Sequence, residues 1–219
     1  MITSSAPSPA PRWRRRPTQR PDEIAAAALR TFARRGLHQT TLDDVAKEAG
    51  ISKGTIYLYF KSKEELFIAA AQQVIPTPEE LPLPSATPRT EEGLRATLRE
   101  VARLMYRRFR TPAYLAFFSI IAAETLRHPE WGQLYFQRIV LALNRRVAVL
   151  FQQAITAGLA RELDPLLTAR AFLGMFLIMA VTQEHLGGKR LTPFSEAHIV
   201  ESLTDIFLCG ISPQKEPRS

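Results

Sequence analysis

Hydrophobic positions recur with helical spacing along nearly the whole chain. Ile24, Ala28 and Phe32 stand at i, i+4 and i+8, so they share one face of a helix. Pro21 suits the first turn of this helix and Gly36 its end. Runs of alternating apolar and polar β-branched residues, the pattern of a half-buried strand, do not occur. The sequence therefore predicts an all-α protein.

Three short helices are predicted next, each begun by a serine or threonine that can accept hydrogen bonds from first-turn amides. They are Leu42–Ala49 after Thr40 or Thr41, a helix from Ser52 to about Phe60, and a helix from Ser62 to Pro76. A tight turn at Gly50 and Ile51 joins the first two. Two short helices joined by such a turn form a helix-turn-helix unit, whose second helix can lie in a DNA major groove.

A proline-rich segment divides the chain. Residues 76–88 contain five prolines and few charges, which predicts a stiff, extended connection. Beyond it, Gly158, Gly187 and Gly210 are expected to end helices. The helices expected there are Glu91–Arg110, Pro112–Arg127, Glu130–Ala157, Pro165–Leu186 and Ser195–Leu208.

The 219-residue chain has a formal net charge of +8, and most of the excess lies near its start. Residues 1–66 carry 12 Lys and Arg against 7 Asp and Glu, net +5, which leaves net +3 for residues 67–219. A basic segment ahead of a nearly balanced body indicates that one end binds an anionic polymer and the rest does something different.

Cysteine usage and hydropathy indicate a cytoplasmic protein outside the membrane. The single cysteine, Cys209, excludes an intramolecular disulfide and a cysteine-rich zinc site, and we expect it to be buried. The longest uncharged stretch after the first helix, Ala171–Gln183, is shorter than the ~20 apolar residues of a membrane-spanning helix. The start of the chain lacks the apolar stretch of a secretion signal.

The residues of the helix-turn-helix segment carry a family resemblance. They include Thr40-Thr41, Ala49-Gly50, Ser52-Lys53-Gly54-Thr55, Tyr57-Leu58-Tyr59-Phe60 and Ser62-Lys63-Glu64. Residues 21–67 closely resemble the N-terminal DNA-binding domain of the TetR/AcrR family of bacterial transcriptional regulators. Leu37 departs from the family, which often has an aromatic residue there. The resemblance implies a helical, divergent C-terminal domain that binds a ligand and forms a dimer.

The domain organisation follows from these boundaries. We predict a basic arm (1–20), an N-terminal three-helix helix-turn-helix domain (21–67), and the end of a linking helix with the proline-rich connection (68–90). A larger C-terminal helical domain for effector binding and dimerisation (91–210) and a short tail (211–219) complete the chain.

Candidate DNA-binding side chains gather at the second helix of the motif. Lys53, Gly54 and Thr55 stand at its amino end, where they can meet base edges. Hydroxyl and ammonium groups expected to position the phosphate backbone are those of Thr41, Tyr57, Tyr59, Lys61 and Lys63. The resemblance implies DNA contact for Thr41, Lys53, Thr55, Tyr57, Tyr59 and Lys63. The competing interpretations are a core role for Tyr57 and a solvated charge for Lys61.

The Arg12–Arg20 arm, with five arginines and Trp13, fits two interpretations equally. It can contact the minor groove or phosphates of DNA, or it can be a solubilising tail.

The last two long helices carry apolar residues on more than one side, as expected for helices packed between their own core and a partner. The resemblance implies a homodimer through these helices, and the candidate interface residues are Phe172, Phe176, Met179, Ile206 and Phe207. Adaptable aromatic, methionine and isoleucine side chains in the middle helices of the larger domain are candidates for an effector pocket or for ordinary core. They are Met105, Tyr106, Phe109, Tyr114, Phe117, Phe118, Ile121, Phe136 and Met175.

Catalytic and metal-binding chemistry is not evident. Glu124 and His128 lie four residues apart, but a surface pair explains this spacing better than a metal site. A nucleophile with an adjacent base and a phosphate-binding loop are lacking, so the sequence argues against an enzyme and predicts no cofactor.

The function predicted is a dimeric, sequence-specific DNA-binding transcriptional regulator. We expect a repressor released from a palindromic double-stranded operator by a small, largely apolar effector. An activator, a repressor without an effector, and an interaction protein whose helix-turn-helix has lost DNA binding are the alternatives.

Overall fold

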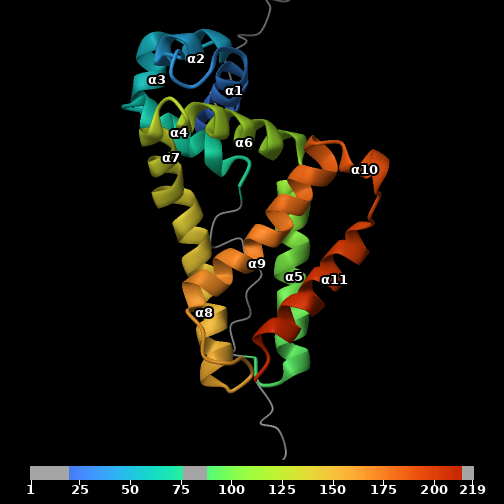
Figure 1. Ribbon diagram of the computed structural model, residues 1–219. Coiled ribbons are helices and arrows are strands. Elements are labelled where there is room, and N and C mark those ends of the chain that lie inside the picture. Colours follow the sequence, from blue (N-terminus) through green and yellow to red (C-terminus); the bar gives the residue numbers. More distant parts are fainter. Residues whose placement is uncertain (1–19, 76–87, 214–219) are drawn as a thin grey trace, which may run out of the picture.

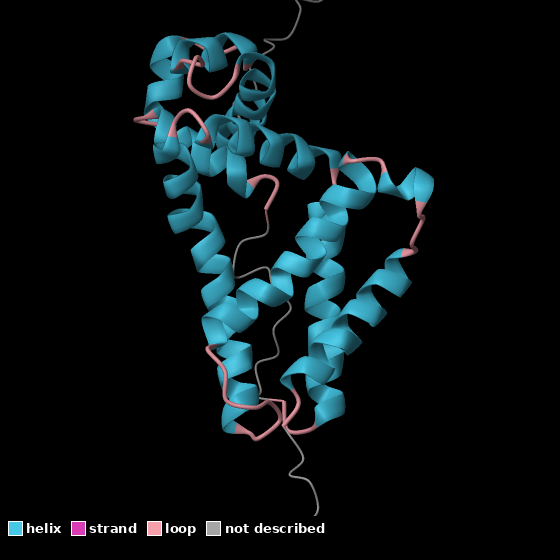
Figure 2. Ribbon diagram, viewed as in Figure 1, coloured by secondary structure: helices cyan, strands magenta, loops and turns pink. Residues whose placement is uncertain are grey.

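The computed structural model describes residues 20–75 and 88–213, and these ranges are helical without strands (Figures 1 and 2). The predicted all-α class is confirmed. The predicted arm except Arg20, nearly all of the proline-rich connection and the last six residues of the tail lie outside the described residues.

The N-terminal helices pack as a small unit at one end of the molecule (Figure 1). They are α1 (Arg20–Arg35), α2 (Leu42–Glu48), α3 (Lys53–Tyr59) and α4 (Lys63–Gln72). Thr41, Ser52 and Ser62 accept hydrogen bonds from the third amide of their helices, so the serine caps lie where they were predicted. The hydroxyl group of Thr40 instead donates to the carbonyl oxygen of Gly36 at 2.7 Å, which leaves the α2 cap to Thr41.

The larger helical part extends away from this unit. Its elements are α5 (Glu91–Phe109), α6 (Pro112–Thr125), α7 (Pro129–Tyr135), α8 (Leu141–Thr156), α9 (Pro165–Ala180), α10 (Gly188–Leu191) and α11 (Glu196–Ile211). A π-helical turn, η2 (Phe136–Val140), joins α7 to α8, and a second, η3 (Val181–His185), extends α9. Helix α9 packs against α5, α8 and α11, and α11 packs along α5 (Figure 1).

One helix end and one short helix differ from the expectation. Gly210 does not end α11, which continues to Ile211, because Ile211 is buried and its carbonyl accepts a hydrogen bond from the Arg161 amide at 2.9 Å. The cost of glycine in a helix, about 1 kcal/mol, is smaller than such tertiary contacts. The short helix α10 carries no apolar stripe in the sequence and was not predicted.

Helix α9 with η3, Pro165–His185, has the length and mean hydropathy (1.7) of a membrane-spanning helix. Part of its apolar surface is used inside the protein: Phe172 and Phe176 are fully buried, and Phe172 packs against Phe151 and Phe207 at centroid distances of 5.9 and 5.0 Å. Only 33% of its most apolar window is buried, and one such helix is weak evidence for a membrane span.

The corner between α6 and α7 depends on a glycine. A Cβ atom at Gly132 would lie 2.5 Å from Cγ2 and 2.6 Å from Oγ1 of Thr125, well inside van der Waals contact. Thr125 is β-branched and its χ1 rotation is restricted, so it cannot easily give way. The close approach of α7 to the end of α6 therefore requires glycine at this position.

We expect Gly132→Ala to lower the free energy of unfolding by about 1–3 kcal/mol, because the added methyl group overpacks this corner. At this chain length Tm falls by about 2–4 °C per kcal/mol. Gly174→Ala is the matched control, since a Cβ atom there meets no other atom within 4 Å. Equal Tm values for the two variants would contradict the packing role of Gly132.

Candidate DNA-binding interface

The second helix of the helix-turn-helix is anchored on one side and open on the other. Gly50 at φ +64° reverses the chain after α2, and the Ile51 amide donates to the Ala46 carbonyl at 3.0 Å. Ile56 is fully buried, whereas Tyr57 is 46% exposed. Helix α3 therefore packs on the core through Ile56 and leaves its opposite face accessible.

Lys53 and Thr55 stand at the amino end of α3, as predicted, and both have polar partners. The Lys53 ammonium lies 2.7 Å from Oδ2 of Asp43, the second residue of α2. Hydrogen bonding and charge attraction from Asp43 raise the pKa of Lys53. The Thr55 hydroxyl lies 2.7 Å from that of Ser52, the α3 cap. These contacts hold both side chains at the helix end before any ligand is present.

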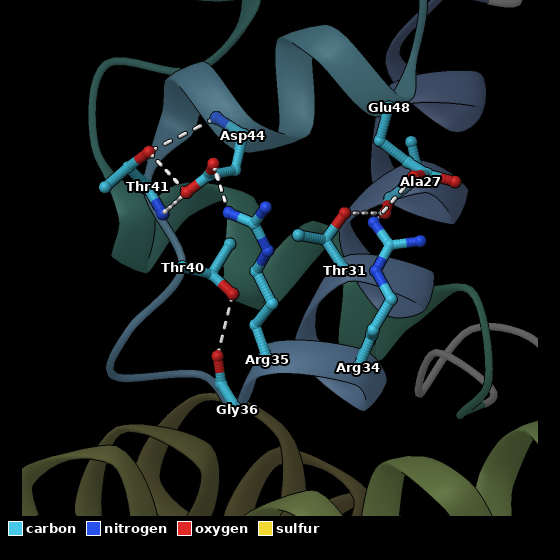
Figure 3. Close-up of polar contacts among 9 residues, drawn as sticks. All are labelled: Ala27, Thr31, Arg34, Arg35, Gly36, Thr40, Thr41, Asp44 and Glu48. Atoms are coloured by element: carbon cyan, nitrogen blue, oxygen red, sulfur yellow. Dashed lines mark hydrogen bonds and ion pairs between the residues drawn. The ribbon is translucent and has the colours of Figure 1, made fainter.

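Ion pairs and a capping box fix α2 against α1 (Figure 3). The Thr41 amide and hydroxyl both donate to Oδ2 of Asp44, and Arg35 pairs with the other oxygen of that carboxylate. Hydrogen bonds from Thr41, supported by Arg35, lower the pKa of Asp44. Glu48 pairs with Arg34 at 2.8 Å and with Arg30 at 3.0 Å, which lowers its pKa. Thr41 is exposed but its hydroxyl group is already engaged.

The remaining candidates on α3 and the turn after it divide by exposure. Gly54, Tyr57 and Lys61 are exposed, whereas Tyr59 is partly buried against the core. Lys63 is partly buried, and its ammonium donates to the carbonyl groups of Leu37 and His38 rather than pointing outward with the others. Two of its N–H groups therefore serve the loop between α1 and α2, and the phosphate contact expected of Lys63 stays a prediction.

An apolar cavity of about 210 Å³ lies in the larger part of the protein. Its walls come from the end of α4, from α5, α6, α7, η2, α8 and α9. The lining residues are Ile75, Phe109, Tyr114, Phe118, Tyr135, Ile139, Val140, Leu143, Asn144, Arg170, Leu173, Gly174 and Leu177.

Three of the predicted pocket residues line this cavity: Phe109, Tyr114 and Phe118. The other six do not. Met105, Tyr106, Phe117 and Ile121 are buried in the core, Met175 packs partly buried against it, and Phe136 is 38% exposed beneath the Arg170 guanidinium. Helical spacing identifies apolar side chains but does not determine which of two packed faces borders a void.

A few polar groups interrupt the apolar wall of the cavity. Burial raises the pKa of Tyr114 far above its usual range and that of Tyr135 to about 12. Both hydroxyl groups are therefore protonated at neutral pH. Asn144 is 3% exposed and Arg170 is exposed at the cavity edge. The cavity can accept an apolar molecule and offers hydrogen-bonding groups to it.

Two of the predicted interface residues require correction. Phe172 and Phe176 are fully buried within the chain, so they form its core and offer no surface to a partner. Met179 and Phe207 pack partly buried against the same core, and Ile206 is 65% exposed. The sequence interpretation missed Leu167 and Ile178, which are 66% and 56% exposed on α9. Their eleven-residue separation, three helical turns, was the signal that could have placed them on one face.

Cys209 is exposed, contrary to the expectation, because it faces away from the contact of α11 with α5. Within residues 20–75 and 88–213, no group of three His, Cys, Asp or Glu side chains is placed to hold a metal ion. Glu124 and His128 do not face a common ligand. Glu124 accepts a hydrogen bond from the Leu37 amide, and the His128 ring stacks on that of His38.

Comparison with known proteins covers both parts of the chain. Residues 24–70 match the family described as bacterial regulatory proteins, tetR family, and residues 96–210 match the AefR-like transcriptional repressor C-terminal domain. A fatty acid metabolism regulator protein of Bacillus subtilis is 47% identical over 47 residues, 22% of this chain and 24% of that protein. The curated relatives are matched over only about a quarter of their own length.

Solved structures match over nearly the full length. The flavonoid-responsive regulator FrrA is 30% identical, with a TM-score of 0.67 over 90% of this chain and 100% of that one. The fatty acid degradation regulator FadR from Bacillus halodurans shares the fold, with 20% identity and a TM-score of 0.64 over 87% and 98% of the two chains. The expectation of a regulator rather than an enzyme is confirmed by these matches.

We expect Asp43→Asn to raise the affinity for random-sequence duplex DNA, because it frees the Lys53 ammonium and removes a negative charge beside it. One additional phosphate contact raises this affinity about fivefold per protomer at about 0.15 M salt, and it makes the affinity fall more steeply as salt is added. Fluorescence anisotropy over a salt series measures both. Glu100→Gln, an exposed change of equal charge on α5, is the control, and an equal gain in that variant would contradict a local effect.

Proposed function

Because the chain belongs to the TetR family of bacterial transcriptional regulators, we propose that it is a repressor that binds a palindromic operator as a homodimer. A small, largely apolar effector entering the cavity releases the DNA. The observation that carries the proposal is the exposed amino end of α3, where Lys53, Gly54 and Thr55 follow the Ser52 cap.

The chemistry of this helix end suits base edges in a major groove. The Lys53 ammonium can donate to guanine O6 and N7, and the Thr55 hydroxyl and methyl groups suit several bases. Gly54 adds no side chain and allows the backbone to approach. Tyr57 and Lys61, both exposed, are the proposed donors to phosphates. Thr41 is exposed as well, and its hydroxyl group would exchange its hydrogen bond to Asp44 for one to a phosphate. Base contacts then provide specificity and phosphate contacts provide register.

The outward faces of α9 and α11 support a homodimer. Leu167 and Ile178 on α9 and Ile206 on α11 are each more than half exposed, although they are large and apolar. A second copy packed on these faces would remove them from water. A two-fold axis between the copies matches the symmetry of a palindrome, whose half-sites in successive major grooves lie about 34–36 Å apart or a multiple of that distance.

The cavity supports control by a small molecule. Its wall is mostly apolar and includes Ile75, just after α4 of the DNA-binding unit, and residues of α6, which packs against α1. One solved relative is described as flavonoid-responsive and others as fatty acid regulators, so apolar molecules are a reasonable class to test. An effector shifts the DNA equilibrium only if it binds the DNA-competent and released geometries with different affinity.

Replacing Lys53 and Thr55 together by alanine tests the recognition helix. We expect operator affinity to fall on the order of 100-fold with the dimer intact, because two base contacts are lost. Footprinting on the DNA upstream of the gene, over a salt series, measures the loss. Lys189→Ala with Thr192→Ala, both exposed in the larger part, is the matched control. An unchanged footprint in the Lys53/Thr55 variant would rule out α3 as the base-reading element.

Replacing Ile178 and Ile206 by glutamate tests the proposed dimer. We expect sedimentation to show a monomer, because four charges would be buried per interface without partners. Leu126→Glu, at an 87% exposed position near the end of α6, should leave the mass unchanged. A dimeric mass for the Ile178/Ile206 variant would place the interface on another face.

A further inference from the structure

The loop between α1 and α2 is held from two sides by charged side chains. Oε1 of Glu124, near the end of α6, accepts a hydrogen bond from the Leu37 amide at 2.9 Å. The Lys63 ammonium, at the start of α4, donates to the carbonyl oxygens of Leu37 at 3.2 Å and of His38 at 2.8 Å. In this short stretch of backbone, the Leu37 N–H is therefore bound by a residue of α6, and the carbonyl oxygens of Leu37 and His38 are bound by a residue of α4. We call Glu124 and Lys63 the loop clamp.

The surroundings of the loop clamp leave it little freedom. Gly36 has φ +81°, a conformation that strains other residues, and a Cβ atom there would lie 2.8 Å from Oε1 of Glu124, so a larger residue would also displace the Glu124 carboxylate. The Lys63 ammonium lies 5.3 Å from the centroid of the Trp131 ring, and burial lowers the pKa of Lys63. The charges of Glu64 and Glu124 oppose that shift. A partly buried ammonium with few alternative partners holds its hydrogen bonds in one geometry.

Each clamp residue is connected to the cavity through its helix. Lys63 begins α4, and Ile75, in the turn that follows α4, lines the cavity and donates its amide to the Ala71 carbonyl of that helix. Tyr114 and Phe118 of α6 line the cavity, while Glu124 stands near the end of that helix. Helix α6 itself and the turn after α4 thus border the cavity, and the far ends of the two helices hold the Leu37–His38 backbone.

We infer that Glu124 and Lys63 are positioning residues that transmit the state of the cavity to the DNA-binding helices. This inference rests on the proposed effector response. If α4 and α6 shift relative to one another, both hydrogen-bond sets cannot be kept, because their distances and angles tolerate little change. The loop then follows one helix or is released, and α2, which begins four residues after His38, moves with it. Packed elements of this kind switch between discrete arrangements.

Amide hydrogen exchange in the full-length protein without DNA tests the loop clamp. In Glu124→Ala, exchange of the Leu37 amide is expected to be about tenfold faster or more, because a hydrogen bond to a charged acceptor is lost. Glu124→Gln keeps an acceptor oxygen and is expected to restore protection. Lys63→Met, which keeps an apolar stem beneath Trp131, removes the donors from the other side. Amides in α5 report any global opening, and Glu201→Ala, an exposed position on α11, is the control.

A double-mutant cycle separates transmission from a merely structural contact. Ile75→Ala loosens the cavity end of α4 and is expected to speed exchange at Leu37 in the wild-type background but to have no further effect in Glu124→Ala. Unchanged Leu37 exchange in Glu124→Ala, or additive effects of the two substitutions, would overturn the inference. The exchange experiment uses no DNA. If the wild-type protein gave no operator footprint, the proposed function would be rejected, whereas the exchange result would still decide the role of Glu124 and Lys63.

Discussion

The burial of Phe67 between the two parts of the chain is the constraint on which the rest of the structure depends. Phe67 lies on α4 and is fully buried, with its ring centroid 5.5 Å from that of Phe117 on α6 and 5.3 Å from that of Trp131 on α7. Helix α4 also packs along α1. Because one side chain belongs to the cores of both parts, the DNA-binding unit cannot rotate freely on the larger helices without opening a packed interior.

Polar contacts refine the orientation that this packing sets. Glu124 and Lys63 hold the loop that precedes α2, and the stacked rings of His38 and His128, 3.7 Å apart, add a second contact between the same loop and the start of α7. Buried apolar contact provides most of the stabilisation, whereas hydrogen bonds to the backbone define one angle of attachment. Lys63, within a motif associated with DNA, contributes here to the attachment.

Helix α9 shows how one segment serves two environments. Its inward face, including Phe172 and Phe176, completes the core, and its outward face carries Leu167 and Ile178. Leu173 and Leu177 border the cavity between these faces. A helix that is apolar on several sides contributes side chains to the core, to the cavity wall and to the surface. Its composition alone therefore does not tell which residue contacts which neighbour.

The sequence by itself determined the all-α class, most helix boundaries and the helix-turn-helix, because caps such as Ser52 and Ser62 and turns such as Gly50 act over a few residues. Only the tertiary structure decided that Phe172 is core, that Lys63 turns inward, and that residues from six helical elements and the turn after α4 meet around one cavity. Those outcomes depend on which helix faces meet across long sequence separations, and periodicity marks a face as apolar without identifying what packs against it.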